Sequence, residues 1–157
     1  MTTIGVISDT HKLLRPEAKA QLRHSDLIIH AGDIGSADVI SELEHIAPVR
    51  AIRGNIDKDA WADAYPDEDV VEVEGRFIYV LHNLRELALD PKAAGFDVVI
   101  SGHSHRPAIE RKNGVLYLNP GSAGPRRFTL PIALARLTLK DGEIRATIEE
   151  IQPRTRI

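Results

Sequence analysis

Short apolar runs rich in β-branched residues alternate with amphipathic segments along the first third of the chain. The runs at 3–8 ("TIGVIS"), 26–31 ("DLIIHA") and 49–52 ("VRAI") have turn formers beside them, which is typical of strands buried on both faces. The segments between them, 15–24 and 36–46, have the spacing of helices. This βαβαβ order predicts a parallel sheet with helices packed on it.

The second half of the chain has a different pattern. Residues 70–82, 109–119 and 131–151 each predict a β-hairpin, and the last two contain the turn dipeptides Asn-Gly and Asp-Gly. A short helix is expected over 90–95, followed by a strand at 97–101. These strands are more than one simple parallel sheet would take. We therefore predict an α/β fold, a four-layer α/β/β/α sandwich of two mixed β-sheets flanked by helices.

Bulk properties narrow the function classes. The chain has 157 residues, no internal repeat and no linker, so residues 1–157 are expected to form a single domain. The net charge of −3 argues against a broad nucleic-acid footprint. The longest apolar run, "FIYVL", is far shorter than the roughly 20 residues of a membrane span, and "MTTIGVISDTHK" does not resemble a signal peptide. We expect a soluble cytoplasmic protein without a membrane partner.

The chain contains no cysteine, so any metal ion must be held by nitrogen and oxygen ligands. Side chains of this kind follow five predicted strands, and they are Asp9, His11, Asp33, Asn55, His82, His103 and His105. The carboxyl ends of strands are where ligands bind in open α/β sheets. Residues two apart in an extended segment point the same way, so Asp9 with His11, and His103 with His105, can each address one ion.

Seven candidate ligands exceed what one tetrahedral ion needs and indicate two ions that share a carboxylate. The expected cofactor is two divalent ions per chain, Mn²⁺ first, with Ni²⁺, Zn²⁺, Fe²⁺, Co²⁺ or Mg²⁺ as alternatives. Each motif alone is also ordinary turn chemistry, and only their joint occurrence favours a metal site. Two further histidines, His24 and His45, lie on predicted helices and are assigned to the surface. His30 is a core histidine or a support for the ligands.

The ordered set D-x-H, G-D, G-N, H, G-H-x-H resembles the calcineurin-like metallophosphoesterase superfamily. The short length, with "GNID" and "NPGSAGPR", resembles its small YfcE-like phosphodiesterase branch. The resemblance covers residues 3–127 and implies a double β-sandwich flanked by helices. It also implies two ligand sets, with Asp33 as the bridge: Asp9, His11, Asp33 and His105 for one ion, and Asp33, Asn55, His82 and His103 for the other.

Two positions depart from the pattern of the superfamily. Many members carry a histidine after the G-N asparagine, where it is thought to protonate the leaving group, but this chain has Ile56. Without that acid, good leaving groups are favoured. The histidine after the "FIYVL" strand is usually followed by glycine, whereas His82 is followed by Asn83.

The expected activity is hydrolysis of phosphodiesters or activated phosphoesters, by in-line attack of a hydroxide that bridges the two ions. The candidate catalytic residues are Asn55, Asp57 and His103. Asn55 would orient a phosphate oxygen, and Asp57 orients the water or a neighbouring histidine, or else stabilises its turn. The expected substrate contacts are Ser122, Arg126 and Arg127, because arginine pairs with phosphate bidentately. A structural turn with solvated arginines is the other interpretation of this segment.

A second class of function is a protein-interaction scaffold. The retromer subunit is similar in its motifs, yet it is regarded as a scaffold with little or no phosphatase activity. A scaffold can lose metal ligands freely, and this chain retains all seven, which favours an enzyme with a small phosphoester substrate. A nuclease is disfavoured by the acidic balance. The apolar strands "VLYL" and "IALARL" are either sheet core or the interface of a homo-oligomer.

Overall fold

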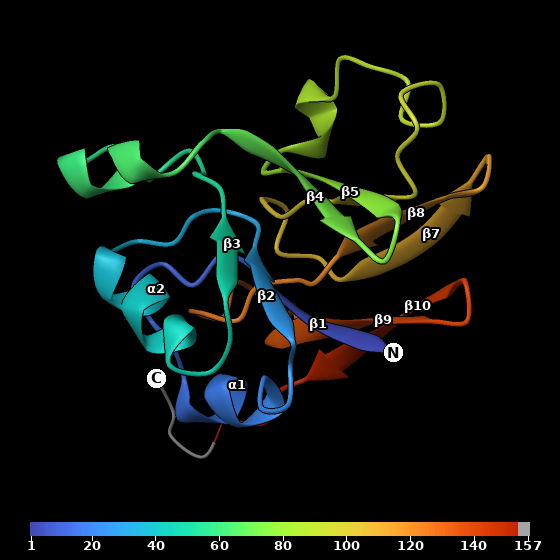
Figure 1. Cartoon of the computed structure of the whole chain (residues 1–157). Helices are drawn as coiled ribbons and strands as arrows, with labels where there is room; N and C mark the ends of the chain where they lie inside the picture. The colour runs from blue at the N-terminus through green and yellow to red at the C-terminus, as the bar shows by residue number, and fades with distance from the viewer. Residues whose placement is uncertain (154–157) are drawn as a thin grey trace.

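Ten strands form two five-stranded sheets in the computed structural model, which describes residues 1–153. The first sheet has the order β10-β9-β1-β2-β3 and consists of β1 (Thr2–Ile7), β2 (Leu27–His30), β3 (Val49–Ala51), β9 (Ala133–Lys140) and β10 (Glu143–Glu150). The second has the order β4-β5-β6-β8-β7 and consists of β4 (Glu68–Val73), β5 (Arg76–Leu81), β6 (Val98–Ile100), β7 (Ala108–Lys112) and β8 (Val115–Asn119). Figure 1 shows both sheets.

Each sheet is mixed, as the sequence predicts. In the first, β1 is parallel to β2 and β2 to β3, whereas β9 and β10 are antiparallel. In the second, β5, β6 and β8 are parallel, and β4 and β7 are antiparallel at the edges. The parallel strands therefore end at a common edge in each sheet, which is where the candidate ligands are expected.

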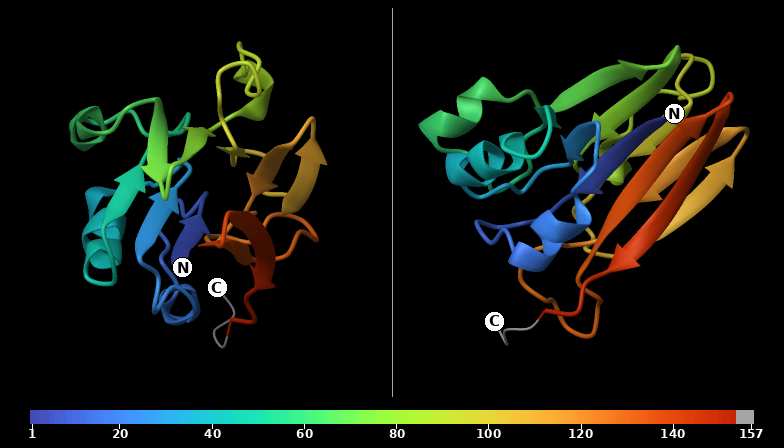
Figure 2. Two further views of the ribbon diagram at one scale, coloured as in Figure 1. Left: turned by 45° about the vertical axis from the view of Figure 1, so that its right-hand side comes forward. Right: turned by 60° about the horizontal axis from the view of Figure 1, so that its bottom comes forward.

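The two sheets pack face to face around one apolar layer. Both sheets contribute buried aliphatic side chains to this layer, among them Ile4, Val6 and Ile29 from the first and Ile78, Ile100 and Leu116 from the second. Such sheet-on-sheet packing is the usual way to bury the inner faces of two twisted sheets. The hairpins β7-β8 and β9-β10 lie beside each other at one end of the molecule (Figure 2).

The outer faces of the two sheets are covered differently. Helices α1 (Pro16–Gln21) and α2 (Ala37–Glu44) lie on the first sheet, where Val39, Ile40 and Leu43 pack into a second apolar cluster. The segment after β5 covers part of the second sheet with Leu87 and Phe96, and its one helical element is the 3₁₀ turn η2 (Leu84–Glu86). Another 3₁₀ helix, η1 (Ala60–Ala64), precedes β4. No helix within residues 1–153 has the length and apolar character that crossing a membrane requires.

All three predicted hairpins are confirmed. The turns of the last two have positive φ at both central residues, 51° and 79° at Asn113-Gly114 and 52° and 78° at Asp141-Gly142. This is the conformation that matches the twist of paired strands.

The expected helix at 90–95 is wrong. Pro91 and Gly95 delimit a single turn, in which the Ala94 amide donates to the Asp90 carbonyl at 3.0 Å. One turn fixes several residues for few hydrogen bonds and does not propagate. The expected helix at 15–24 is also too long, because α1 ends at Gln21 and His24 has a φ of +68°.

Candidate metal centre

The seven predicted ligands follow strands of both sheets and gather at the carboxyl ends of those strands. Three segments come from the first sheet, after β1, β2 and β3, and two come from the second, after β5 and β6. The side chains that they bring to one place are Asp9, His11, Asp33, Asn55, His82, His103 and His105. The site therefore lies across the end of the apolar layer between the sheets.

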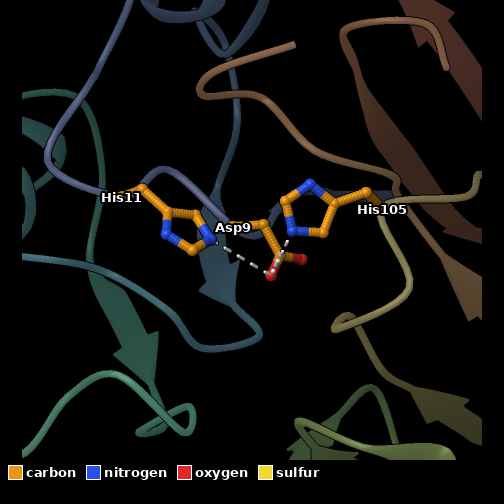
Figure 3. Close-up of side chains that lie close together, drawn as sticks. All are labelled: Asp9, His11 and His105. Carbon is orange, nitrogen blue, oxygen red and sulfur yellow. Dashed lines mark ion pairs between the residues drawn. The ribbon is translucent and has the colours of Figure 1, made fainter. Parts of the chain in front are cut away.

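Asp9 is the buried centre of the site. Its Oδ2 accepts hydrogen bonds from the Ser8 hydroxyl at 2.8 Å and from the His103 amide at 3.2 Å. Its Oδ1 has no hydrogen-bond donor among the described residues. This oxygen instead faces imidazole nitrogens, with His105 Nε2 at 3.4 Å and His11 Nε2 at 3.9 Å (Figure 3). One oxygen thus fixes the carboxylate while the other is directed at the histidines.

The two carboxylate oxygens of Asp33 also have different contacts. Its Oδ1 accepts a hydrogen bond from the Ile56 amide at 3.1 Å. Its Oδ2 lies between two imidazoles, 3.5 Å from His11 Nε2 and 3.3 Å from His82 Nε2. Asp33 therefore connects the histidine of the β1 loop with the histidine that follows β5.

His82 is oriented by the backbone. Its Nδ1 lies 2.7 Å from the carbonyl oxygen of Ala31, so Nδ1 carries the proton and Nε2 faces the two aspartates. A backbone acceptor on the far nitrogen is the usual way in which a protein orients a metal-binding histidine. Asn83, which departs from the superfamily pattern, has a separate role, because its Oδ1 accepts from the Arg85 amide and caps the next turn.

His103 and Asn55 form the exposed side of the site. His103 Nδ1 lies 3.3 Å from Asn55 Oδ1, and the His103 ring packs edge-on against His82 with 5.2 Å between centroids. A cavity of about 290 Å³ opens here, and its lining includes Asn55, His82, His103 and Arg53. These two side chains are therefore the ones that meet a ligand arriving from solvent.

Burial shifts the pKa of several groups at this site. It raises the pKa of Asp9 to about 6. Burial, followed by the charge of Arg127, lowers the pKa of His105 to about 4, so this imidazole stays neutral near pH 7. At His82 burial opposes the charged ring, but the nearby Asp33 carboxylate, the Ala31 carbonyl and the charge of Asp9 together outweigh burial and raise the pKa. A bound cation would compensate the buried carboxylates and bind the neutral imidazoles.

The donor set fits divalent metal ions. Four buried polar atoms, Asp9 Oδ1, His11 Nε2, His82 Nε2 and His105 Nδ1, have no hydrogen-bond partner among residues 1–153. The ligand atoms fall into two groups close enough for one ion each, Asp9 with His11 and His105, and Asp9 with Asp33 and His82. Mixed imidazole and carboxylate ligation suits Mn²⁺, Fe²⁺, Co²⁺, Ni²⁺ or Zn²⁺. The carboxylate common to these two groups is Asp9, whereas the family resemblance implies Asp33 as the bridge; a shared carboxylate is in either case the arrangement that a pair of ions needs.

Five of the candidate ligands hold the backbone in the left-handed region. Their φ values are 55° at Asp9, 46° at His11, 56° at Asp33, 70° at His103 and 61° at His105. This region is uncommon for residues other than glycine and costs free energy, so its repeated use at one site indicates a functional constraint. The sequence gives no direct signal of this backbone conformation.

Asp57 lies beside the site but its oxygens are occupied. They accept hydrogen bonds from the amides of Ile34 and Gly35, both at 3.0 Å, and of Gly54 at 2.9 Å. This supports the turn-stabilising interpretation over the orientation of water. Asp57 joins the loop that carries Asp33 to the loop that carries Asn55.

The three expected substrate contacts differ in position. The Ser122 hydroxyl is buried and donates to the Asp9 carbonyl at 3.0 Å, which supports a structural role. Arg126 Nε donates to the Leu130 carbonyl at 3.3 Å within its own loop. Arg127 is exposed and lines a large cavity together with His103, which places it beside the metal centre.

Sequence reasoning missed two supports of the site. Ser8 fixes Asp9, and Thr10 lies 3.0 Å from His30 Nε2 while its hydroxyl donates to the Ile34 carbonyl. His30 Nδ1 accepts from the Gly32 amide at 3.1 Å, so His30 is a satisfied core histidine that joins two ligand-bearing loops. A hydroxyl beside a metal-binding aspartate has no distinctive spacing, and no sequence signal marks it.

Comparison with known proteins agrees with this geometry. The model of the calcineurin-like phosphoesterase superfamily domain matches residues 2–142. A probable metallophosphoesterase of Methanothermobacter thermautotrophicus is 39% identical over 143 residues, which cover 82% of this chain and 81% of that protein. The solved structure of an archaeal phosphodiesterase superposes with a TM-score of 0.78 at 28% identity and covers 94% of this chain and 100% of that one.

The fold is also that of Vps29 proteins. Vps29 of Chaetomium thermophilum superposes with a TM-score of 0.75 at 19% identity, covering 96% of this chain and 97% of that one, and this likeness shows the fold alone. The resemblance predicted from the motifs is confirmed by the family match, which covers most of the chain. With its two mixed sheets and its histidine and aspartate cluster, the chain belongs to the calcineurin-like phosphoesterase superfamily.

Proposed function

We propose that this metallophosphoesterase is a phosphodiesterase that works with two divalent ions. The observation that carries the proposal is the arrangement of Asp9 Oδ1 and Asp33 Oδ2, which face three imidazole Nε2 atoms at 3.3–3.9 Å. A buried carboxylate pair surrounded by histidines, with its other oxygens fixed by donors from the protein, is a binding site for cations.

The proposed ligand sets are those implied by the family resemblance. Asp9, His11, Asp33 and His105 would hold one ion, and Asp33, Asn55, His82 and His103 would hold the other. The position of Asp33 Oδ2 between His11 and His82 supports Asp33 as the bridge. Asp9 Oδ1 also lies 3.8 Å from His82 Nε2, so Asp9 stays close to both sets.

The ions would neutralise the phosphate oxygens and lower the pKa of a bound water for in-line attack. The chain itself supplies orientation. Asn55 and His103 border the open cavity, where the Asn55 amide would position a phosphate oxygen. Ile56 follows Asn55 and is 44% exposed, so no acid occupies the position that protonates a leaving group in many relatives. Esters with good leaving groups should therefore react best, and Mn²⁺ is the proposed ion.

The test starts from metal-stripped protein, assayed on bis(p-nitrophenyl) phosphate and p-nitrophenyl phosphate. Mn²⁺, Ni²⁺, Zn²⁺ and Mg²⁺ are restored singly. We expect metal-dependent release of p-nitrophenol from the diester, and loss of at least 100-fold in kcat/KM with Asp33→Asn. His45→Asn, at an exposed histidine far from the site, is the matched control and should retain activity. Metal binding without turnover of either ester would overturn the proposal and favour a scaffold.

A further inference from the structure

A second and larger cavity, of about 680 Å³, begins at His103 and runs across the outer face of the second sheet. Tyr117 and Ala108 of the hairpin β7-β8 form part of its floor. Its walls include residues 83–85 together with Arg127, Phe128 and Leu130. This volume lies within the range of small-molecule sites. Asn83 and His103 line both cavities, so the larger cavity borders the metal centre.

Three arginines line this cavity, Arg85, Arg106 and Arg127, and the one acidic side chain in the lining is Glu110. None of the three guanidinium groups makes a hydrogen bond or ion pair with a residue in the range 1–153. Several other arginines pair with carboxylates, as Arg50 does with Asp69 at 2.8 Å. Unpaired guanidinium groups around a cavity are suited to bind phosphate bidentately.

The same cavity offers aromatic and apolar surface. Tyr117 is half-buried in the floor, and Leu84 and Leu130 lie in the walls. Phe128 lies in the lining with 88% of its surface exposed and a φ of +55°. Water surrounds most of this ring, and the uncommon backbone conformation indicates a functional constraint. The ring is therefore available to stack on a planar base.

We propose that this cavity binds the retained part of a phosphodiester substrate, and that this part carries an aromatic base and a second phosphate. The inference rests on the proposed function, because the scissile phosphate must lie at the metal centre beside His103. Arg85 and Arg106 would bind the second phosphate, Phe128 would stack on the base, and Arg127 would lie between the two phosphates. The substrate class is then a nucleotide diester and not a simple alkyl or aryl diester.

The test uses two diesters with the same leaving group. One is thymidine 5′-(p-nitrophenyl phosphate), and the other carries an additional 3′-phosphate. Release of p-nitrophenol reports only the diester bond in both. We expect the 3′-phosphate to raise kcat/KM at least tenfold at low salt, and to lose most of this advantage at high salt.

Variants locate the effect. In Arg85→Gln with Arg106→Gln, the ratio of kcat/KM for the two thymidine diesters should fall to near one. Phe128→Ala should lower kcat/KM for both thymidine diesters by the same factor. Arg23→Gln, at another exposed arginine without a guanidinium partner in the described range, is the control and should preserve the ratio.

The two proposals fail in different ways. Turnover of bis(p-nitrophenyl) phosphate without any gain from the 3′-phosphate would overturn the substrate class and leave the phosphodiesterase standing. If no diester is cleaved with any metal, the phosphodiesterase fails. Calorimetric titration with thymidine 3′,5′-bisphosphate then tests the cavity alone, and equal binding to the wild type and the double arginine variant would overturn it.

Discussion

Several side chains around this site hold it together by hydrogen bonds to backbone groups of neighbouring loops. Asp57 is the clearest case, because its carboxylate accepts three amide hydrogen bonds that connect the loops after β2 and β3. Hydrogen bonds to a charged group contribute about 1.5–3 kcal/mol each, and removal of the acceptor leaves the amide donors unpaired. Asp57 is therefore a positioning residue for Asp33 and Asn55.

We expect Asp57→Ala to lower the free energy of unfolding by about 3 kcal/mol or more, since three amides lose their acceptor. Asp57→Asn retains a carbonyl acceptor and should lose less. Urea unfolding measures this order, and metal titration should show weaker binding in the same order. If Asp57 instead oriented the attacking water, Asp57→Asn would lose kcat at saturating metal while its stability stayed unchanged.

His30 predicts a pH dependence of stability. Its complete burial, with the nearby His82 as a further cause, lowers its pKa to about 3, against 6.5 in the unfolded chain. Between these two pH values the unfolded state binds more protons than the folded state. The contribution of His30 to the free energy of unfolding is therefore fully present above pH 6.5 and falls as the pH decreases. From pH 7 to pH 5 this group alone removes about 2 kcal/mol.

The variant His30→Asn tests this, because asparagine keeps an acceptor for the Gly32 amide and does not titrate. We expect its loss of stability from pH 7 to pH 5, measured by urea unfolding of metal-free protein, to be about 2 kcal/mol smaller than that of the wild type. Equal pH dependence in both proteins would contradict the assignment.

At the scale of elements, the strands hold the ligands and glycines let the loops approach. Gly102 lies two residues after the end of β6, and a Cβ there would lie 2.8 Å from Asp9 Oδ2 and collide with the Ser8 hydroxyl. Gly32 has a φ of +101°, and a Cβ there would lie 2.6 Å from His82 Nδ1. Both glycines therefore let a loop of one sheet contact the other sheet.

Gly102→Ala should displace Asp9 and weaken metal binding at least tenfold, with a loss of stability of about 1–3 kcal/mol. Isothermal titration with Mn²⁺ measures the affinity. Gly95→Ala is the matched control, because that position has a φ of +85° but nothing within 4 Å of an added Cβ. It should lose stability through strain of the backbone and keep its metal affinity. Equal affinities in the two variants would refute the role of Gly102.

Most elements could be predicted from the sequence because their signals are local. The β-branched runs located β1, β2, β3 and β6, and the Asn-Gly and Asp-Gly turns located two hairpins. The segment 90–95 has the composition of a helix, but it is too short to continue beyond one turn. The coverage of the second sheet by a mostly irregular segment depends on tertiary contacts of Leu87 and Phe96, which no local pattern reports.

The sequence predicted which candidate ligands gather at one place, but not which residues support them. Imidazoles and carboxylates after strands carry a signal because they recur at one edge of each sheet, and five such segments are rarely coincidental. The contacts of Ser8 and Thr10 depend on which loops meet, so their roles appear only in three dimensions, whereas for His30 and Asp57 the structure selects among roles that the sequence left open. The Ser122 hydroxyl, expected to meet phosphate, is directed at a backbone carbonyl for the same reason.

At the scale of the whole molecule, the candidate metal ligands come from both sheets, Asp9 and Asp33 from the first and His82 and His105 from the second. A ligand that binds only the folded state stabilises it by about 2.7 kcal/mol at 100 times its dissociation constant. Two expectations stay predictions: that residues 1–157 form one domain, and that copies of the chain associate. Light scattering measures the oligomeric state.

Addition of saturating Mn²⁺ to stripped protein should raise the melting temperature by about 5–10 °C for a chain of this size. In Asp33→Asn the rise should be at most a third of that value. Differential scanning calorimetry measures both, with Mg²⁺ as the comparison ion. An equal rise in the wild type and in Asp33→Asn would mean that the ion binds elsewhere.

The origin of the ligands in both sheets has a further consequence. An ion held jointly by Asp9 and His105 ties together two points that are distant along the chain. In chain statistics such an ion acts as a reversible cross-link, and it restricts the two halves of the polypeptide as a long disulfide would, without a covalent bond. Removal of the metal should therefore let the two sheets move relative to each other and should also abolish the proposed hydrolysis. The availability of the ion would then set both the rigidity and the activity of the protein.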